Sequence, residues 1–243
     1  VVRCFLFTDI EGSTRLWERE PLRMRAAVAR HDVLSREAVQ AAGGRVVKTT
    51  GDGVHAVFDE PAQGLQAALA LQQALAAPAP DDGLALKVRC GLHCGESEAR
   101  DGDYYGPVLN RAARVMGAAH GGQTLLTQAV AERLPGRLPE GAALQDLGSV
   151  RLRDLASPER VWQLLHPTLR AQFPPLRSLE ATPNNLAQQL NSFVGREREL
   201  AEVRALLGRT RLLTLMGMGG IGKSRLSVQL GAELLDEYPD GVW

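Results

Sequence analysis

The stretch that most limits the fold is residues 46–58, because it combines strong strand formers with a tight-turn sequence. Two runs rich in β-branched and aromatic residues flank Gly-Asp-Gly at positions 51–53. This pattern predicts a β-hairpin whose turn lies at these three residues. Lys48 and Asp52 are the charged residues near its tip. Either they form a solvated ion pair, worth ~0–1 kcal/mol, or Asp52 holds a metal ion while Lys48 contacts a substrate.

Strand and helix patterns alternate on both sides of the hairpin. The patterns predict strands at 1–8, 84–94, 123–127, 144–152 and 160–165, and helices at 21–42, 62–77, 108–119 and 129–134. The first six elements have the order β-α-β-β-α-β, which is the ferredoxin-like pattern. We therefore expect residues 1–166 to form one α/β domain, an α+β sandwich, with residues 96–105 as a projecting loop or arm.

A linker-like stretch separates this domain from a second unit. Residues 167–190 are rich in Pro, Gln and Asn and lack hydrophobic periodicity, which is typical of a linker. Residues 191–243 contain a predicted helix at 198–207, a strand at 212–216 and a helix at 225–238.

Between that strand and the last helix, residues 217–224 match the phosphate-loop pattern G-x-x-x-x-G-K-S. Backbone N–H groups of such a loop, between Gly217 and Gly222, would surround nucleotide phosphates. Lys223 would reach the β- and γ-phosphates, and Ser224 would contact Mg²⁺. The loop therefore predicts a binding site for ATP with Mg²⁺, and its position between a strand and a helix argues against a simple glycine-rich turn.

Composition bears on the class of protein. The chain has 243 residues, of which 44% are hydrophobic, and a formal net charge of zero. Nothing electrostatic favours nucleic acid or a membrane surface, no apolar run approaches the ~20 residues that span a bilayer, and no signal peptide opens the chain. Cys4, Cys90 and Cys94 lack disulfide spacing, so we expect buried free thiols and a cytoplasmic protein. The sequence begins within a predicted strand without Met and stops at Trp243, so we expect it to be cut at both ends.

Two aspartates are candidates for a metal site. Asp9 ends the first strand and Asp52 lies in the hairpin turn, so both can meet at one edge of the sheet. Paired carboxylates repel unless a cation lies between them, and Mg²⁺ commonly takes one or two carboxylates together with substrate phosphates. Backbone N–H groups of Gly12, Ser13 and Thr14, just after Asp9, can hold phosphate oxygens. Two independent turn aspartates are the alternative.

A second candidate group lies on the helix expected at 108–119. Asn110 and Arg114 are four residues apart and therefore share a helix face. An amide and a guanidinium on one face suit a polar ligand that develops negative charge. The alternative is a solvated pair on the surface, which is how we interpret Arg111.

The resemblance to one protein family depends on four segments that occur in a fixed order. They are FLFTDIEGST, VKTTGDGVHAVF, KVRCGLHCGE and DYYGPVLNRAAR. They resemble the class III nucleotidyl cyclases, the catalytic domain of adenylyl and guanylyl cyclases, over residues 1–166. The resemblance implies two Mg²⁺ or Mn²⁺ ions held by Asp9, Asp52 and the carbonyl of Ile10. It also implies that Asn110 and Arg114 stabilise the transition state and that Arg89 binds the triphosphate.

The same resemblance implies which purine is bound. The purine-selecting positions fall on Lys48 and Asp103, although Asp101 lies close enough for the assignment to shift. An ammonium donates to adenine N1 and a carboxylate accepts from N6, so this pair suits ATP. The implied reaction forms 3′,5′-cyclic AMP and pyrophosphate at a head-to-tail homodimer interface. Asp9 and Asp52 would come from one subunit, and Lys48, Asp103, Asn110 and Arg114 from the other.

The second unit has its own resemblance. FVGRERELAEV, together with the phosphate loop, resembles signal-transduction ATPases of the AAA-like, NB-ARC type. Similar cyclase–ATPase fusions are bacterial regulators that often end in a helix-turn-helix domain, so any DNA-binding output would lie in a part not present here. The second acidic metal motif is absent from the sequence, so we do not expect hydrolysis by this portion alone.

Three hypotheses follow. The first is an adenylate cyclase linked to a regulatory ATP-binding module. The second is a catalytically silent cyclase-like domain that dimerises or senses nucleotide for an ATPase regulator. A guanylyl cyclase is the third, and Lys48 and Asp103 disfavour it. We interpret the histidines of the domain as structural or surface residues, namely His31, His55, His93 and His120.

Overall fold

The computed structural model describes residues 1–78, 83–100, 102–134, 136–152, 155, 157–178, 185–186, 193, 195–234, 238 and 241–243. The chain divides into two compact units. The first comprises Val1–Val150 and Pro158–Leu176, and the second Arg151–Ser157 and Arg177–Trp243.

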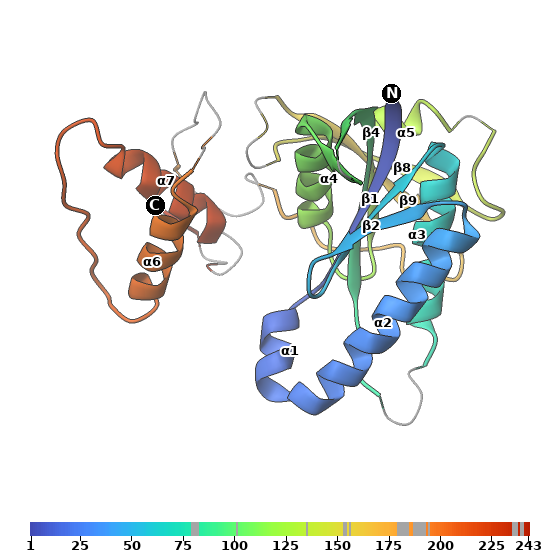
Figure 1. The fold of residues 1–243 in the computed structure, drawn as a ribbon, viewed down its shortest axis with the longest axis horizontal. Helices are drawn as coiled ribbons and strands as arrows, with labels where there is room; N and C mark the ends of the chain where they lie inside the picture. The colour runs from blue at the N-terminus through green and yellow to red at the C-terminus, as the bar shows by residue number, and fades with distance from the viewer. Residues whose placement is uncertain are drawn as a thin grey trace. The chain divides into compact units, whose positions relative to one another are not determined.

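The first unit is built on a seven-stranded sheet with the strand order β2-β3-β1-β4-β7-β9-β8 (Figure 1). Its strands are β1 (Val2–Ile10), β2 (Arg45–Thr49), β3 (Val54–Phe58), β4 (Val88–Glu96), β7 (Thr124–Thr127), β8 (Ala143–Val150) and β9 (Glu159–Leu165). β1 lies between β3 and β4 and is antiparallel to both, whereas β4 and β7 are parallel. The predicted β-α-β-β-α-β order is confirmed. The arm at 96–105 contains a two-stranded ribbon, β5 (Glu98–Arg100) and β6 (Asp103–Tyr105).

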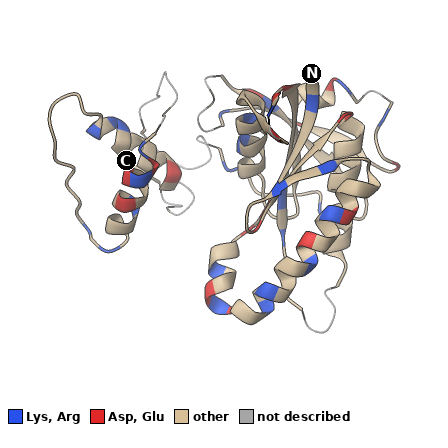
Figure 2. Ribbon diagram, in the orientation of Figure 1, with Lys and Arg blue, Asp and Glu red and all other residues tan. Residues whose placement is uncertain are grey.

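Helices cover the two faces of the sheet (Figure 1). α2 (Pro21–Ala41) and α3 (Pro61–Ala76) lie on one side, and α4 (Pro107–Ala118) lies on the other. Two shorter helices, α1 (Ser13–Arg19) and α5 (Gln128–Ala131), complete the unit. No helix among the described residues is long and apolar enough to cross a membrane, and the long helix α2 carries charges of both signs (Figure 2).

Alternation along β1 divides the core into two layers. Cys4, Leu6 and Ile10 pack with residues of α2 and α3, whereas Phe5 and Phe7 pack with residues of α4. Successive side chains of a strand point to opposite faces. Asp9 therefore lies on the same face of the sheet as Phe5, Phe7 and α4.

Glycine allows α4 to lie directly on the sheet. A Cβ at Gly91 of β4 would collide with the backbone of Met116 in α4, and one at Gly95 would come 3.1 Å from Cγ2 of Val108. Ala112 is completely buried between them. The helix is thus held close to β1 and β4, which fixes the direction of its exposed face.

The segment after β9 packs against the first unit instead of leaving it. Gln163 Nε2 donates to the carbonyl of Ala171 at 2.7 Å, and a ring nitrogen of His120 lies 2.9 Å from the carbonyl oxygen of Pro175. The ring of Phe173 stacks on His120. Residues 167–176, which we expected to begin the linker, are therefore part of this compact unit, and much of 179–190 lies outside the described residues.

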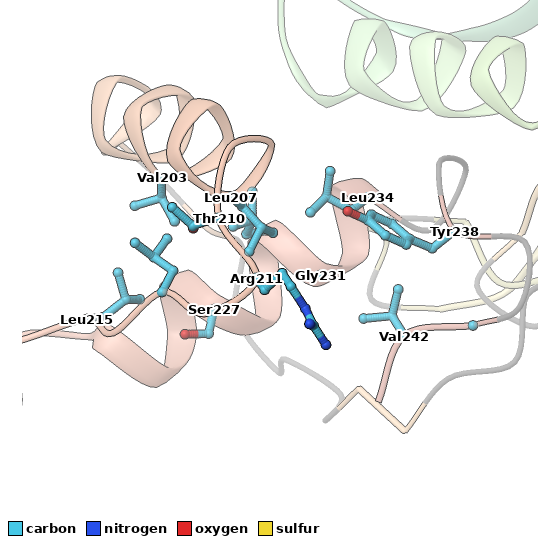
Figure 3. A pocket seen from close by; sticks show the side chains of 13 residues that line it. Val203, Leu207, Thr210, Arg211, Leu215, Ser227, Gly231, Leu234, Tyr238 and Val242 are labelled. Atoms are coloured by element: carbon cyan, nitrogen blue, oxygen red, sulfur yellow. The ribbon is translucent and has the colours of Figure 1, made fainter.

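The second unit contains two helices, α6 (Glu197–Leu207) and α7 (Lys223–Leu234). Leu200 and Val203 of α6 form a small core with Leu226, Leu230 and Leu234 of α7. A cavity of about 530 Å³ lies beside this core, and mainly apolar side chains from both helices line it (Figure 3). The last predicted helix extended to 238, but residues 235–237 lie outside the described part.

The strand expected at 212–216 is wrong for the described structure. Leu213 and Leu215 pack toward the two helices, while Leu212 and Met216 are 83% and 89% exposed. The segment therefore keeps the alternation of a strand. It has no strand partner among the described residues, and a strand is defined by such pairing.

Candidate active site

The turn of the hairpin is pressed against the end of β1. Ile10 N–H donates to the carbonyl of Asp52 at 3.1 Å, and Val54 N–H donates to Oγ1 of Thr8 at 2.9 Å. A Cβ on Gly53 would collide with the carbonyl oxygen of Thr8, so only glycine permits this approach. The Gly-Asp-Gly turn thereby brings Asp52 beside Asp9, as the sequence predicted.

Asp9 lies in an electrostatically mixed environment. Its carboxylate forms an ion pair with Arg89, which lies directly opposite on β4. Burial raises the pKa of Asp9, Arg89 opposes that shift, and the nearby Asp52 adds to it. Nε of Arg89 is buried and has no hydrogen-bond partner among the described residues. Arg89 is therefore at the site, where it neutralises one of the two carboxylates.

The oxygen atoms gathered here fit a hard divalent cation. Asp9 and Asp52 supply carboxylates, and Ile10, whose carbonyl is the third expected ligand, follows Asp9 and donates its N–H to the carbonyl of Asp52. No group of three or more His, Cys, Asp or Glu side chains that could hold a metal occurs in the described part of the chain. A cation would therefore need further oxygen ligands, as Mg²⁺ commonly takes from water and substrate phosphates.

The residues expected to bind phosphate, Gly12 to Thr14, come shortly after Asp9 in the sequence. Gly12 has a left-handed backbone (φ +70°) and precedes the first turn of α1, which begins at Ser13. Thr14 lies in the same turn. Their role in holding phosphate stays a prediction.

A separate pocket of about 640 Å³ lies on the α4 face of the sheet. Its lining includes Lys48, Asp103, Asn110 and the aromatic residues Phe5 and Phe7. Nζ of Lys48 lies 2.9 Å from Oδ2 of Asp103, and this hydrogen bond lowers the pKa of Asp103. Lys48 is thus paired with Asp103, and the alternative of an ion pair between Lys48 and Asp52 is wrong.

A β-bulge directs Lys48 into this pocket. The register of β2 against β3 shifts between Val46, which pairs with Ala56, and Lys48, which pairs with His55. One extra residue, Val47, therefore changes the face on which Lys48 lies. Without the bulge, Lys48 would lie on the α2 and α3 face of the sheet.

Helix α4 supplies the remaining candidates. Asn110 and Arg114 are exposed one turn apart, while Val108, Ala112 and Val115 are buried. Asn110 also lines the pocket. Arg111 forms a 3.0 Å ion pair with Glu159 of β9 instead, away from this face. Asp101, the alternative to Asp103, lies outside the described residues.

Sequence reasoning missed His55 as a member of the pocket. His55, which we interpreted as structural or surface, lines it beside Lys48 and stacks on Phe7. Strand alternation offered a signal, because His55 lies between Val54 and Ala56, which both face the other core.

In the second unit, the glycine-rich loop closes around its lysine. Nζ of Lys223 donates to the carbonyls of Gly217 and Met218, each at 2.9 Å. Gly222 has φ +88° and directly precedes α7, which begins at Lys223. Arg196 donates to the carbonyl of Ile221 at 2.8 Å and so ties the upstream motif to the loop.

Comparisons with known proteins agree on the first unit. The family model described as adenylate and guanylate cyclase catalytic domain matches residues 3–165. An uncharacterized protein of Mycobacterium tuberculosis is 41% identical over 199 residues, which is 81% of this chain and 67% of that protein. An adenylate cyclase of Lachancea kluyveri is 38% identical over 147 residues, covering 50% of this chain and 8% of that protein.

Solved structures give the same result. An adenylate cyclase of Trypanosoma brucei in its monomeric state matches with 27% identity and a TM-score of 0.63, over 72% of this chain and 92% of that one. An adenylate/guanylate cyclase/hydrolase from Silicibacter pomeroyi matches with 31% identity and a TM-score of 0.58, over 68% of this chain and 96% of that one.

Proposed function

Because the chain belongs to the family of adenylate and guanylate cyclase catalytic domains, we propose that it is an adenylate cyclase that converts ATP to 3′,5′-cyclic AMP and pyrophosphate. The observation that carries the choice of ATP is the ion pair between Lys48 and Asp103 in the α4-face pocket. Relatives named adenylate cyclase support the same choice.

The pair matches the edge of adenine. Adenine presents an acceptor, N1, next to a donor, the N6 amino group. An ammonium and a carboxylate held 2.9 Å apart offer a donor and an acceptor side by side in the same order. Guanine carries the reverse pattern at N1 and O6, so its edge would face a like group at both positions. Such mismatches discriminate between bases because polar groups that the bound base covers are left unpaired.

The reaction joins the ribose 3′-oxygen to the α-phosphorus. The 3′-hydroxyl loses its proton, its oxygen bonds to phosphorus, and the bond from phosphorus to the bridging oxygen breaks to release pyrophosphate. Arg114 and Asn110, one turn apart on α4, would hydrogen-bond to the phosphoryl oxygens as their charge develops. The protein's main contribution is to position the reacting groups and to neutralise the negative charge of the phosphates.

Asp9, Asp52 and the Ile10 carbonyl would hold the divalent cations, two Mg²⁺ or Mn²⁺, that this chemistry uses. When bound, these ions would favour deprotonation of the hydroxyl and neutralise the triphosphate. Arg89 is already beside Asp9 and would move between that carboxylate and phosphate oxygens. Gly12, Ser13 and Thr14 would offer backbone N–H groups to the same phosphates.

We further propose that two copies form a head-to-tail homodimer. Each chain would contribute Asp9 and Asp52 to one site and Lys48, Asp103, Asn110 and Arg114 to the other. Exposure of Asn110 and Arg114 on α4 supports a site that another surface completes. The three buried free thiols suit a reducing compartment such as the cytoplasm.

An activity assay on the full chain tests this proposal. With ATP and Mn²⁺, we expect cyclic AMP to accumulate, and with GTP much less cyclic GMP. Asp52→Ala removes a metal carboxylate and is expected to abolish product. Asp59→Ala is the matched control, because Asp59 follows β3 just as Asp52 precedes it and its side chain is 76% exposed. No product from a dimeric wild-type chain would instead favour the catalytically silent alternative.

For the second unit, the proposal is a regulatory module that binds ATP with Mg²⁺ at residues 217–224. The support is the closure of the glycine-rich loop around the Lys223 ammonium, where phosphate oxygens would replace carbonyls. ATP with Mg²⁺ should slow tryptic cleavage after Arg211 and Arg225 in the wild-type chain and leave it unchanged in Lys223→Ala. Equal protection in both chains would contradict binding at this loop.

A further inference from the structure

His55 lines the α4-face pocket together with Lys48 and Asp103. It lies opposite Phe7 of β1 on one side and opposite Lys48 of β2 on the other. Its ring stacks on Phe7 with the centroids 3.8 Å apart and the planes 6° apart. The imidazole is therefore fixed in orientation between an aromatic ring and the residue that carries the ammonium.

The ring nitrogens of His55 have no hydrogen-bond partner among the described residues, and the side chain lines the pocket with Lys48, Asp103 and Asn110. The side chain is half-buried, and its ring nitrogens are not among the buried unpaired atoms of the described residues, so a molecule in the pocket can reach them. A polar ring held rigidly in a pocket, with its nitrogens unused, is suited to a ligand with hydrogen-bonding groups of its own.

The surrounding charges favour the neutral ring. Burial lowers the pKa of His55, Lys48 lowers it further, and Asp103 opposes the shift. These are the charged groups that line the pocket in the described part of the chain; Tyr104 and Tyr105 are the other titratable ones. A neutral imidazole offers one donor and one acceptor.

We propose that His55 is a base-positioning residue of this pocket, whose neutral ring supports Lys48 and hydrogen-bonds to the purine of the bound nucleotide. This inference rests on the proposed adenylate cyclase function. Protonation would place a second cation beside Lys48, where both compete for Asp103. The ammonium and carboxylate would then no longer face the adenine edge in the order that the base requires.

Two variants test the hydrogen bond from the ring to the base. His55→Phe keeps the stack on Phe7 but removes both nitrogens, and His55→Ala removes the ring. Losing one hydrogen bond to the base is expected to raise the KM for ATP about tenfold in either variant, with kcat little changed. In the wild-type chain KM should rise as the pH falls from 7.5 to 5.5, and in His55→Phe this rise should be absent.

The control is His166→Phe, because His166 lies outside the pocket and contacts Gln73 and Thr168. Binding of a fluorescent ATP analogue, measured in the Lys223→Ala background, provides a second readout that does not need turnover. If the wild-type chain binds the analogue but makes no cyclic nucleotide, the proposed function fails while the binding data still test His55. Wild-type affinity and an unchanged pH profile in both His55 variants, with folding verified by circular dichroism, would overturn the proposal.

Discussion

Lys48 Nζ lies 2.9 Å from the carboxylate of Asp103, although 55 positions separate the two residues in the sequence. The contact joins an edge strand of the sheet to the β5–β6 ribbon, and both sides of it face the pocket beside α4. The proposed base-selecting pair therefore owes its geometry to two different elements.

Reversing this pair should reverse the preference for the base. In Lys48→Glu/Asp103→Lys, an acceptor faces N1 and a donor faces the exocyclic group, which matches guanine. We expect each single variant to lower kcat/KM for ATP by about 10- to 100-fold, and the double variant to prefer GTP. Initial rates with both nucleotides measure this. A double variant that still prefers ATP would show that other groups select the base.

The close approach of α4 should make Gly91 intolerant of a side chain. In Gly91→Ala the new Cβ would collide with the backbone of Met116, and such overpacking costs about 1–3 kcal/mol. Gly117→Ala, on α4 itself, is the control, because no atom lies within 4 Å of its Cβ. It should be neutral or slightly stabilising. Urea denaturation compares the two, and equal effects would contradict the packing described.

The amide pair of Gln123 and Gln163 should contribute to stability. Nε2 of Gln123 donates to Oε1 of Gln163 at 2.7 Å, Nε2 of Gln163 donates to the carbonyl of Ala171, and both glutamine side chains are buried. Gln163→Leu leaves Nε2 of the buried Gln123 unpaired, at a cost of about 1–3 kcal/mol. It should also expose residues 167–176 to proteases.

Gln145→Leu is the matched control for this substitution. Gln145 pairs with Gln163 across β8 and β9 but is exposed. Its replacement is expected to change the free energy of unfolding by less than about 0.5 kcal/mol. Equal losses in both variants would show that the buried amide pair is unimportant.

Stability should fall in acid partly because of His93. Burial lowers the pKa of this side chain to about 4, from an ordinary value of 6.5. A depressed histidine pKa means that the folded state favours the neutral ring. The contribution of the neutral ring to the free energy of unfolding is therefore fully present above pH 6.5 and is lost as the pH falls toward 4.

Between pH 6.5 and 4, the free energy of unfolding falls by about 3 kcal/mol because of His93. His93→Asn keeps a polar group near Thr127, the present partner at 2.8 Å, but cannot titrate. Its unfolding free energy should be lower at pH 7 and fall less steeply between pH 6.5 and 4. An unchanged slope would assign the acid sensitivity to other groups.

Short-range patterns predicted much of this architecture. Apolar alternation and turn chemistry specified the strand and helix order and placed Asp9 and Asp52 at one end of the sheet, because the turn at 51–53 depends on local glycines. They did not predict the bulge at Val47, since a register shift depends on how β2 fits the whole sheet. Alternation places His55 on the same face as Phe7, but its position next to Lys48 depends on the same bulge.

Two segments show where local sequence patterns fail to predict the structure, namely the packed segment 167–176 and the unpaired segment 212–216. The first lacks periodicity, yet side-chain hydrogen bonds hold it against the first unit. The second has the alternation of a strand, yet strand structure also needs a neighbour. Composition and period report what a segment favours locally, and tertiary contacts decide the outcome.

In the proposed homodimer, each catalytic site combines residues from two chains. Asp52→Ala chains lack the metal half, and Arg114→Ala chains lack the transition-state half, so each alone should form no cyclic AMP. After mixing and reassociation, every heterodimer has one intact site, and activity should return to about a quarter of the wild-type value. No recovery, with heterodimers detected by differential tags, would contradict the shared site.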